Sequence, residues 1–110
     1  MKQTLPFLLL FAWLSQTHAA SDEQFAVIKQ LGQLNGIALH CKALPETQRM
    51  KRALVLNLPK RRQLGELFDI ESHQSFMQFI SDEATCPPGS ELNQRVSDAI
   101  TELEAAFHKQ

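Results

Sequence analysis

The chain has 110 residues, enough for one small domain and too short for two. Its 11 basic and 12 acidic residues leave a formal net charge of -1. This near balance argues against nucleic acid as a partner, because bulk electrostatic attraction to phosphates requires an excess of positive charge.

The first twenty residues have the pattern of a cleavable signal peptide. Lys2 supplies a positive charge, residues 5–14 form an apolar run, and small residues follow as far as Ala20. The apolar run is far shorter than the ~20 residues that a membrane-spanning helix needs. We therefore expect a removable leader over residues 1–20, and a single helical domain over residues 21–110 without a transmembrane segment. The protein is then periplasmic or secreted.

The chain has two cysteines, Cys41 and Cys86. Compartments that receive exported proteins are oxidising, and two cysteines allow one intramolecular pairing. Two free thiols or an intermolecular bridge are the alternatives. We predict a disulfide between Cys41 and Cys86, which for a loop of this length stabilises a protein by on the order of 4 kcal/mol in the chain-entropy model.

The mature sequence predicts helices throughout. Ser21 to Gln24 has the form of a capping box. The helix that follows repeats apolar residues every three or four positions, so that Cys41 falls on its inward-facing side. Gly32 and Gly36 lie one turn apart, a spacing that favours close packing against a neighbouring helix.

The other helices are predicted in the same way. We expect a helix from residue 45 to about 58, a short helix over residues 60–68, a helix over residues 70–83 capped by Asp69, and a last helix capped by Ser90. No stretch shows the alternation of a strand. The predicted class is all-α, a compact array of four to five short helices stapled by one disulfide.

Charge is distributed unevenly along the chain. Between residues 42 and 62 seven basic residues stand against Glu46 alone, whereas acidic residues predominate from residue 64 onward. Arginine suits the recognition of phosphate and carboxylate groups, so this segment is a candidate site for an anionic lipid, a polyanion or an acidic protein face. The alternative is a solvated surface that balances the acidic half of the same protein. The candidate binding residues are Arg49, Arg52, Lys60, Arg61 and Arg62.

Some apolar side chains are candidates for a groove that holds an amphipathic client. In a chain this short the same side chains are also needed for a core. The candidates are Val55, Leu56, Phe76, Met77 and Phe79.

No pattern in the sequence indicates catalysis. Two pairs of a carboxylate and a histidine lie four residues apart, as on one side of a helix: Asp69 with His73, and Glu104 with His108. Either pair alone supplies too few ligands for a metal ion. There is no CxxC motif for dithiol chemistry and no CxxCH motif for haem. We therefore expect a protein that is not an enzyme and uses no cofactor or metal.

In layout the chain resembles the small periplasmic acid-stress chaperones, which are all-helical, carry a signal and are bridged by one disulfide at a spacing like that of Cys41 and Cys86. It is also similar to the helical pilotins of type II secretion, in which a Leu-Pro pair shortly follows a cysteine, as Leu44 and Pro45 follow Cys41. The lipid-attachment cysteine of pilotins has no counterpart at the predicted cut. Neither resemblance transfers a functional residue.

The expected function is that of a small exported, non-enzymatic binding or chaperone-like accessory protein with a protein partner or client. The alternatives are an envelope assembly or secretion-machinery component, or a small secreted inhibitor or effector that acts on one protein. An anionic lipid or polyanion is a further candidate partner. The sequence leaves the oligomeric state open.

Overall fold

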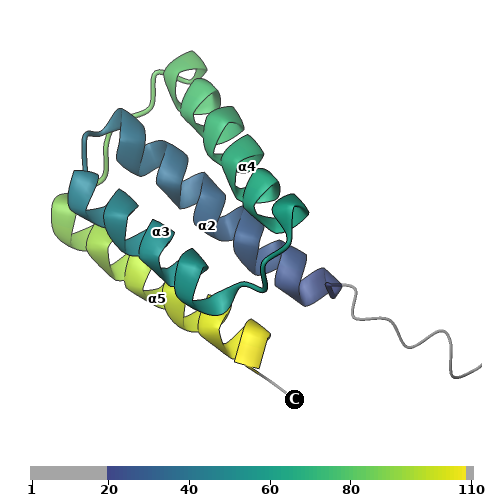
Figure 1. The fold of residues 1–110 in the computed structure, drawn as a ribbon. Helices are drawn as coiled ribbons and strands as arrows, with labels where there is room; N and C mark the ends of the chain where they lie inside the picture. The colour runs from purple at the N-terminus through teal and green to yellow at the C-terminus, as the bar shows by residue number, and fades with distance from the viewer. Residues whose placement is uncertain (1–19, 109–110) are drawn as a thin grey trace, which may run out of the picture.

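The computed structural model describes residues 20–108 and shows an all-α fold with one disulfide (Figure 1). This part of the chain forms four helices: α2 (Asp22–His40), α3 (Leu44–Asn57), α4 (Arg62–Ser81) and α5 (Gly89–His108). The predicted class and the predicted disulfide are confirmed. The predicted signal peptide, apart from Ala20, lies outside the described residues.

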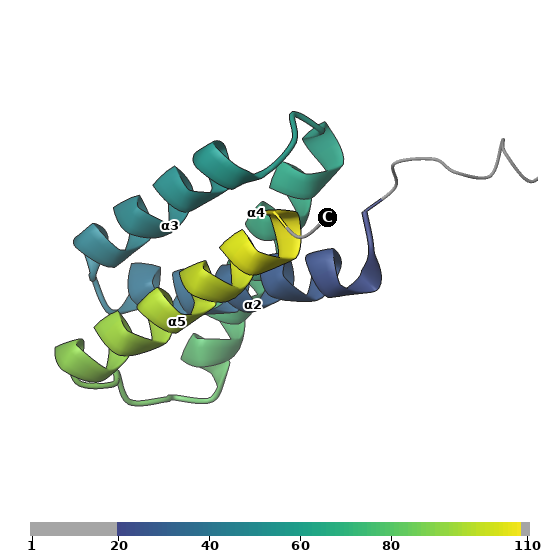
Figure 2. The same ribbon diagram turned by 90° about the horizontal axis from the view of Figure 1, so that it is seen from below.

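The other helices assemble on α2. Its capping box forms as predicted: Ser21 Oγ accepts the N–H of Gln24 at 3.1 Å, and Gln24 Oε1 accepts the N–H of Ser21 at 2.9 Å. The buried residues of α2, from Val27 to Ala38, lie around more than half of its circumference. In Figures 1 and 2, α4 packs along one side of α2, and α3 and α5 pack along the other.

The helices α2 and α4 approach closely because α2 carries glycine where they cross. A Cβ added at Gly36 would lie 2.6 Å from the carbonyl oxygen of Ser72 and 2.6 Å from the Cβ of Ser75, and one added at Gly32 would lie 2.7 Å from the Cβ of Glu71. Cβ atoms in proteins essentially never come this close to other heavy atoms. The close approach predicted from the two glycines is confirmed.

Two hydrogen bonds from side chains supplement this contact. Ser75 Oγ donates to the carbonyl oxygen of Gln33 at 2.7 Å. Asn35 Nδ2 donates to Ser72 Oγ at 3.0 Å, and both of these side chains are buried. A buried polar group without a hydrogen-bond partner destabilises the fold, so the bond between Asn35 and Ser72 favours this register of α4 on α2.

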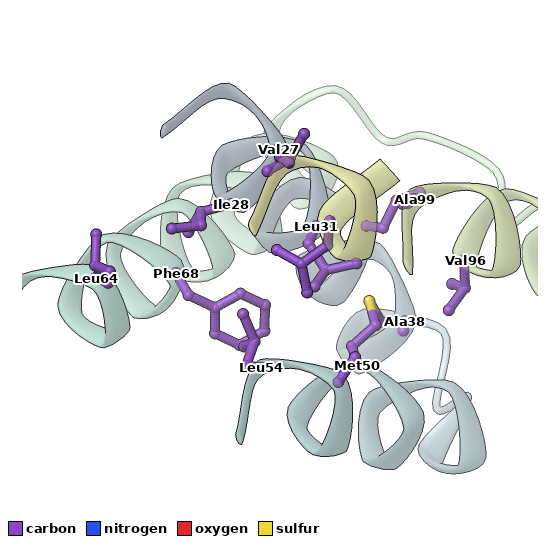
Figure 3. Packing of buried hydrophobic residues seen from close by; sticks show 14 of the residues in the cluster. Val27, Ile28, Leu31, Ala38, Met50, Leu54, Leu64, Phe68, Val96 and Ala99 are labelled. Carbon is purple, nitrogen blue, oxygen red and sulfur yellow. The ribbon is translucent and has the colours of Figure 1, made fainter. Parts of the chain in front are cut away.

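The apolar core lies where the four helices meet (Figure 3). Leu64 and Phe68 are the two buried apolar side chains that α4 contributes to it. In Figure 3 the ring of Phe68 points toward Leu54 of α3. The second half of α4 therefore packs on α2 without entering the main core. The largest side chains that are fully buried are Ile28, Leu31, Met50, Val96 and Leu103.

The predicted break near residue 69 is wrong. One continuous helix, α4, replaces the helices expected over residues 60–68 and 70–83, and Asp69 is an exposed residue within it. The inward positions Leu64, Phe68 and Ser72 repeat every four residues across the expected break. Their burial against the rest of the fold outweighs the capping preference of one aspartate.

The predicted cap of the last helix is also wrong, by two residues. α5 begins at Gly89, and the carbonyl oxygen of Pro88 accepts the N–H of Leu92 at 3.0 Å. Ser90 therefore lies inside the first turn.

A Schellman turn ends α2. The N–H of Ala43 donates to the carbonyl oxygen of Ala38 at 2.8 Å, and Lys42, which bonds to Leu39, has a left-handed φ of 61°. The turn places Cys41 at the C-cap, where it is half-buried. The cysteine thus lies at the edge of the core, whereas the apolar pattern predicted an inward position.

The disulfide joins this helix end to the loop before α5. Cys41 and Cys86 are separated by 45 residues in sequence, and their Cα atoms lie 5.8 Å apart. Residues 82–88 are exposed apart from the half-buried Pro87. Because so few apolar contacts hold this loop, the covalent bond is its main attachment to α2.

The glycine contact gives a matched pair of variants. Gly36→Ala places a methyl group against Ser72 and Ser75, so we expect it to lower the free energy of unfolding by about 2–3 kcal/mol. An added Cβ at Gly65 meets nothing within 4 Å, so Gly65→Ala should raise that free energy by up to about 1 kcal/mol because alanine is the better helix former. Denaturant unfolding followed by circular dichroism measures both. Equal effects would contradict the close approach.

The disulfide gives a second prediction. Replacement of both Cys41 and Cys86 by serine should lower the free energy of unfolding by on the order of 4 kcal/mol, because the unfolded chain regains the freedom of a long loop. Thr85→Ala, at an exposed neighbour of Cys86, is the control and should change it by less than about 0.5 kcal/mol. Denaturant unfolding under non-reducing conditions compares the three proteins. A double variant as stable as the control would show that the bond is unimportant.

Candidate functional site

The structure separates Arg49 from the other four candidate binding residues. Arg49 Nη1 donates to Glu46 Oε1 at 2.7 Å, and Nη2 donates to Ser97 Oγ at 2.7 Å. The second oxygen of Glu46 accepts from Asn93 Nδ2 at 2.9 Å. Arg49 therefore belongs to a polar contact between α3 and α5. The spacing of Glu46 and Arg49, three residues apart on a predicted helix, was a sequence signal for this pairing.

The other four candidates lie on the second half of α3, in the connection that follows it and at the start of α4. Arg52 is exposed on the outer side of α3, Lys60 and Arg61 are exposed in the connection, and Arg62 is the exposed first residue of α4. Figure 1 shows this connection running from the end of α3 to the start of α4.

Exposed apolar side chains accompany these cations. Val55 is 82% exposed and Leu56 is 71% exposed, the highest values among the large apolar residues of the described chain. Each lies one turn beyond a cation of the same helix, Lys51 or Arg52. We call this surface the basic–apolar face; it comprises Lys51, Arg52, Val55, Leu56, Lys60 and Arg62. Arg61, although exposed, also lines a depression with Ala20 and Phe25 at the start of α2.

The basic–apolar face contains no carboxylate. Glu46 is the single acidic residue of α3, its side chain is only 12% exposed, and it is paired with Arg49. From residue 44 to residue 63 every exposed residue is apolar, neutral or basic. The exposed charge of this stretch is therefore entirely positive.

A second apolar surface lies on α4. Ile70, Met77 and Ile80 are each about half exposed, and together with His73 they lie on the side of α4 opposite its buried residues. We call these four residues the α4 strip. Among the described helices, only α2 makes extensive contacts with α4. The opposite side of α4, which carries the strip, is therefore exposed.

An open depression continues the α4 strip toward the start of α2. It has a volume of about 590 Å³, and its apolar lining comes from Phe25, Ala26, Leu67 and Ile70. Ile70 belongs both to the depression and to the strip, so the two form one apolar surface.

The five apolar residues predicted to form a groove are not gathered in one place. Val55 and Leu56 lie on α3 and Met77 on α4, all exposed. Phe76 and Phe79 are half-buried and hold the ring of His40, with centroid distances of 5.6 and 4.9 Å. These two rings belong to the packing between the ends of α2 and α4.

The histidine and carboxylate pairs singled out in the sequence do not belong to a larger cluster of ligands in the described part of the chain. Within residues 20–108 no three His, Cys, Asp or Glu side chains come together as they would around a metal ion. Asp69 and His73 are both exposed on α4. None of the described helices combines the length and the apolar character that a membrane crossing requires.

Comparisons with protein-family models, with curated proteins and with solved structures find no match to this chain. The functional argument therefore depends on the surfaces themselves.

Two arginines of α3 provide a test of the different roles assigned to them. Arg49→Gln should lower the free energy of unfolding by about 1 kcal/mol, because it leaves the covered carboxylate of Glu46 without its cation. That corresponds to a drop in melting temperature of about 4–8 °C for a protein of this size. Arg52→Gln should leave the melting temperature nearly unchanged, since Arg52 is exposed. Thermal unfolding of both variants measures the difference, and equal melting temperatures would contradict it.

Proposed function

We propose that this protein is a non-enzymatic, chaperone-like binding protein of the periplasm, and that it holds apolar segments of a protein client on the α4 strip. The observation that carries the proposal is the exposure of Ile70, Met77 and Ile80 along one side of a helix that only α2 covers extensively among the described helices. A short chain needs nearly all of its large apolar residues for burial. Apolar residues that stay outside the core in one line are therefore best explained by a partner.

The chemistry of the strip suits an amphipathic segment. Side chains that recur along one side of a helix match the apolar side of a partner helix. Methionine adapts its shape to different partners, so Met77 at the middle of the strip favours varied clients. The depression beside Phe25 extends the apolar area that a client covers.

The disulfide supports export. A bond between Cys41 and Cys86 persists where the environment is oxidising, which agrees with the leader expected over residues 1–20. A dedicated partner, as in an envelope assembly component or an inhibitor, is the alternative use of the same strip.

The test is suppression of client aggregation. The wild-type protein should suppress the light scattering of two unrelated clients, reduced insulin and heat-denatured citrate synthase. The double variant Met77→Ser, Ile80→Ser should require several-fold more protein for the same suppression, because the lost apolar contact is worth about 1 kcal/mol or more per side chain. Ala105→Ser, on an exposed position of α5, is the control and should behave as the wild type.

Two results would overturn the proposal. Suppression of neither client by the wild-type protein would remove the chaperone-like function and favour a dedicated partner. Suppression that survives in the double variant, with helicity confirmed by circular dichroism, would remove the α4 strip as the binding surface.

A further inference from the structure

We propose that the basic–apolar face binds the surface of an anionic phospholipid bilayer, with Val55 and Leu56 inserted among the head groups and the surrounding cations paired with lipid phosphates. This surface is separate from the α4 strip, and the inference does not depend on a client.

The first argument is the combination of exposure and position. Val55 and Leu56 are 82% and 71% exposed at the last turns of α3. Lys51 and Arg52 lie one turn before them on the same side of the helix. Long basic side chains keep their charged ends in the head-group region while their methylene stems, and neighbouring apolar residues, enter the acyl boundary.

The second argument is charge. The face has four exposed cations, Lys51, Arg52, Lys60 and Arg62, and no exposed carboxylate lies between residues 44 and 63. The negative surface potential of an anionic bilayer attracts such a cluster, and each Lys or Arg near the surface contributes about fivefold to binding. The chain as a whole has a net charge of -1. Any preference for an anionic surface must therefore come from a local cluster of cations. The protein is then oriented with the basic–apolar face toward the lipid.

The third argument distinguishes a bilayer from other anions. A soluble polyanion gains nothing from Val55 and Leu56, because these side chains offer it no charge or hydrogen bond. An acidic protein face needs a surface shaped to receive two side chains that project from the outer side of a helix. A fluid head-group layer accepts projecting apolar side chains without a preformed shape, so it fits both features of the face.

The experiment measures binding of the full mature protein to vesicles by co-sedimentation. Wild-type protein should bind vesicles of phosphatidylglycerol and phosphatidylcholine, and should not bind vesicles of phosphatidylcholine alone. Lys51→Gln with Arg52→Gln should weaken binding about 25-fold, since two cations are lost. Lys29→Gln with Arg95→Gln removes the same charge from exposed positions on α2 and α5 and should change binding by less than about threefold.

The apolar contribution has its own variant. Val55→Ser with Leu56→Ser keeps the charge and should weaken binding at least about tenfold, because two apolar side chains no longer insert. All these positions are exposed, and circular dichroism checks that each variant remains folded.

Three outcomes would overturn the proposal. The first is equal binding to vesicles with and without phosphatidylglycerol. The second is a loss in the Lys29 and Arg95 control as large as that in the Lys51 and Arg52 variant. The third is binding to soluble poly-L-glutamate without binding to vesicles, which would assign the face to an acidic protein partner.

Discussion

The close contact between α2 and α4 is the constraint on which the exposed surfaces depend. Helix α4 makes extensive contacts with α2 alone among the described helices, so this one contact must hold a helix of 20 residues. Gly32 and Gly36 bring the two backbones together, and the hydrogen bonds of Asn35 and Ser75 favour their register. Close packing increases the number of atoms in van der Waals contact. One side of α4 is therefore held firmly enough for its opposite side to remain uncovered.

The ends of α4 are held differently. At its start, Leu64 and Phe68 enter the common core. Beyond its end, the chain makes few apolar contacts until α5 begins, and the bond from Cys86 to Cys41 returns it to the end of α2. The covalent bond thus replaces an apolar contact that a short chain has no residues left to make.

The sequence predicted the features that local periodicity and covalent chemistry determine. The all-α class, the capping box at Ser21, the close approach at Gly32 and Gly36 and the disulfide follow from spacing or from the number of cysteines. The errors arose where tertiary packing decides between local alternatives. Asp69 has the chemistry of a cap, yet burial of Phe68 and Ser72 on either side of it favours a continuous helix. Val55 and Ile70 remain outside the core because few helices cover the sides of α3 and α4 on which they lie. The periodicity of the sequence does not say how many helices cover each element.

The two exposed surfaces differ in charge, and this difference argues for separate partners. The basic–apolar face has cations and no carboxylate, whereas Glu66 and Asp69 are exposed beside the α4 strip. An anionic bilayer is complementary to the cations of the first surface, and the carboxylates beside the second do not attract it. Val55 and Leu56 of the basic–apolar face lie on α3, whereas the apolar residues of the α4 strip lie on α4, and both helices contact α2. The proposed lipid contact and the proposed client contact would therefore use surfaces of different chemistry on helices that both pack on α2.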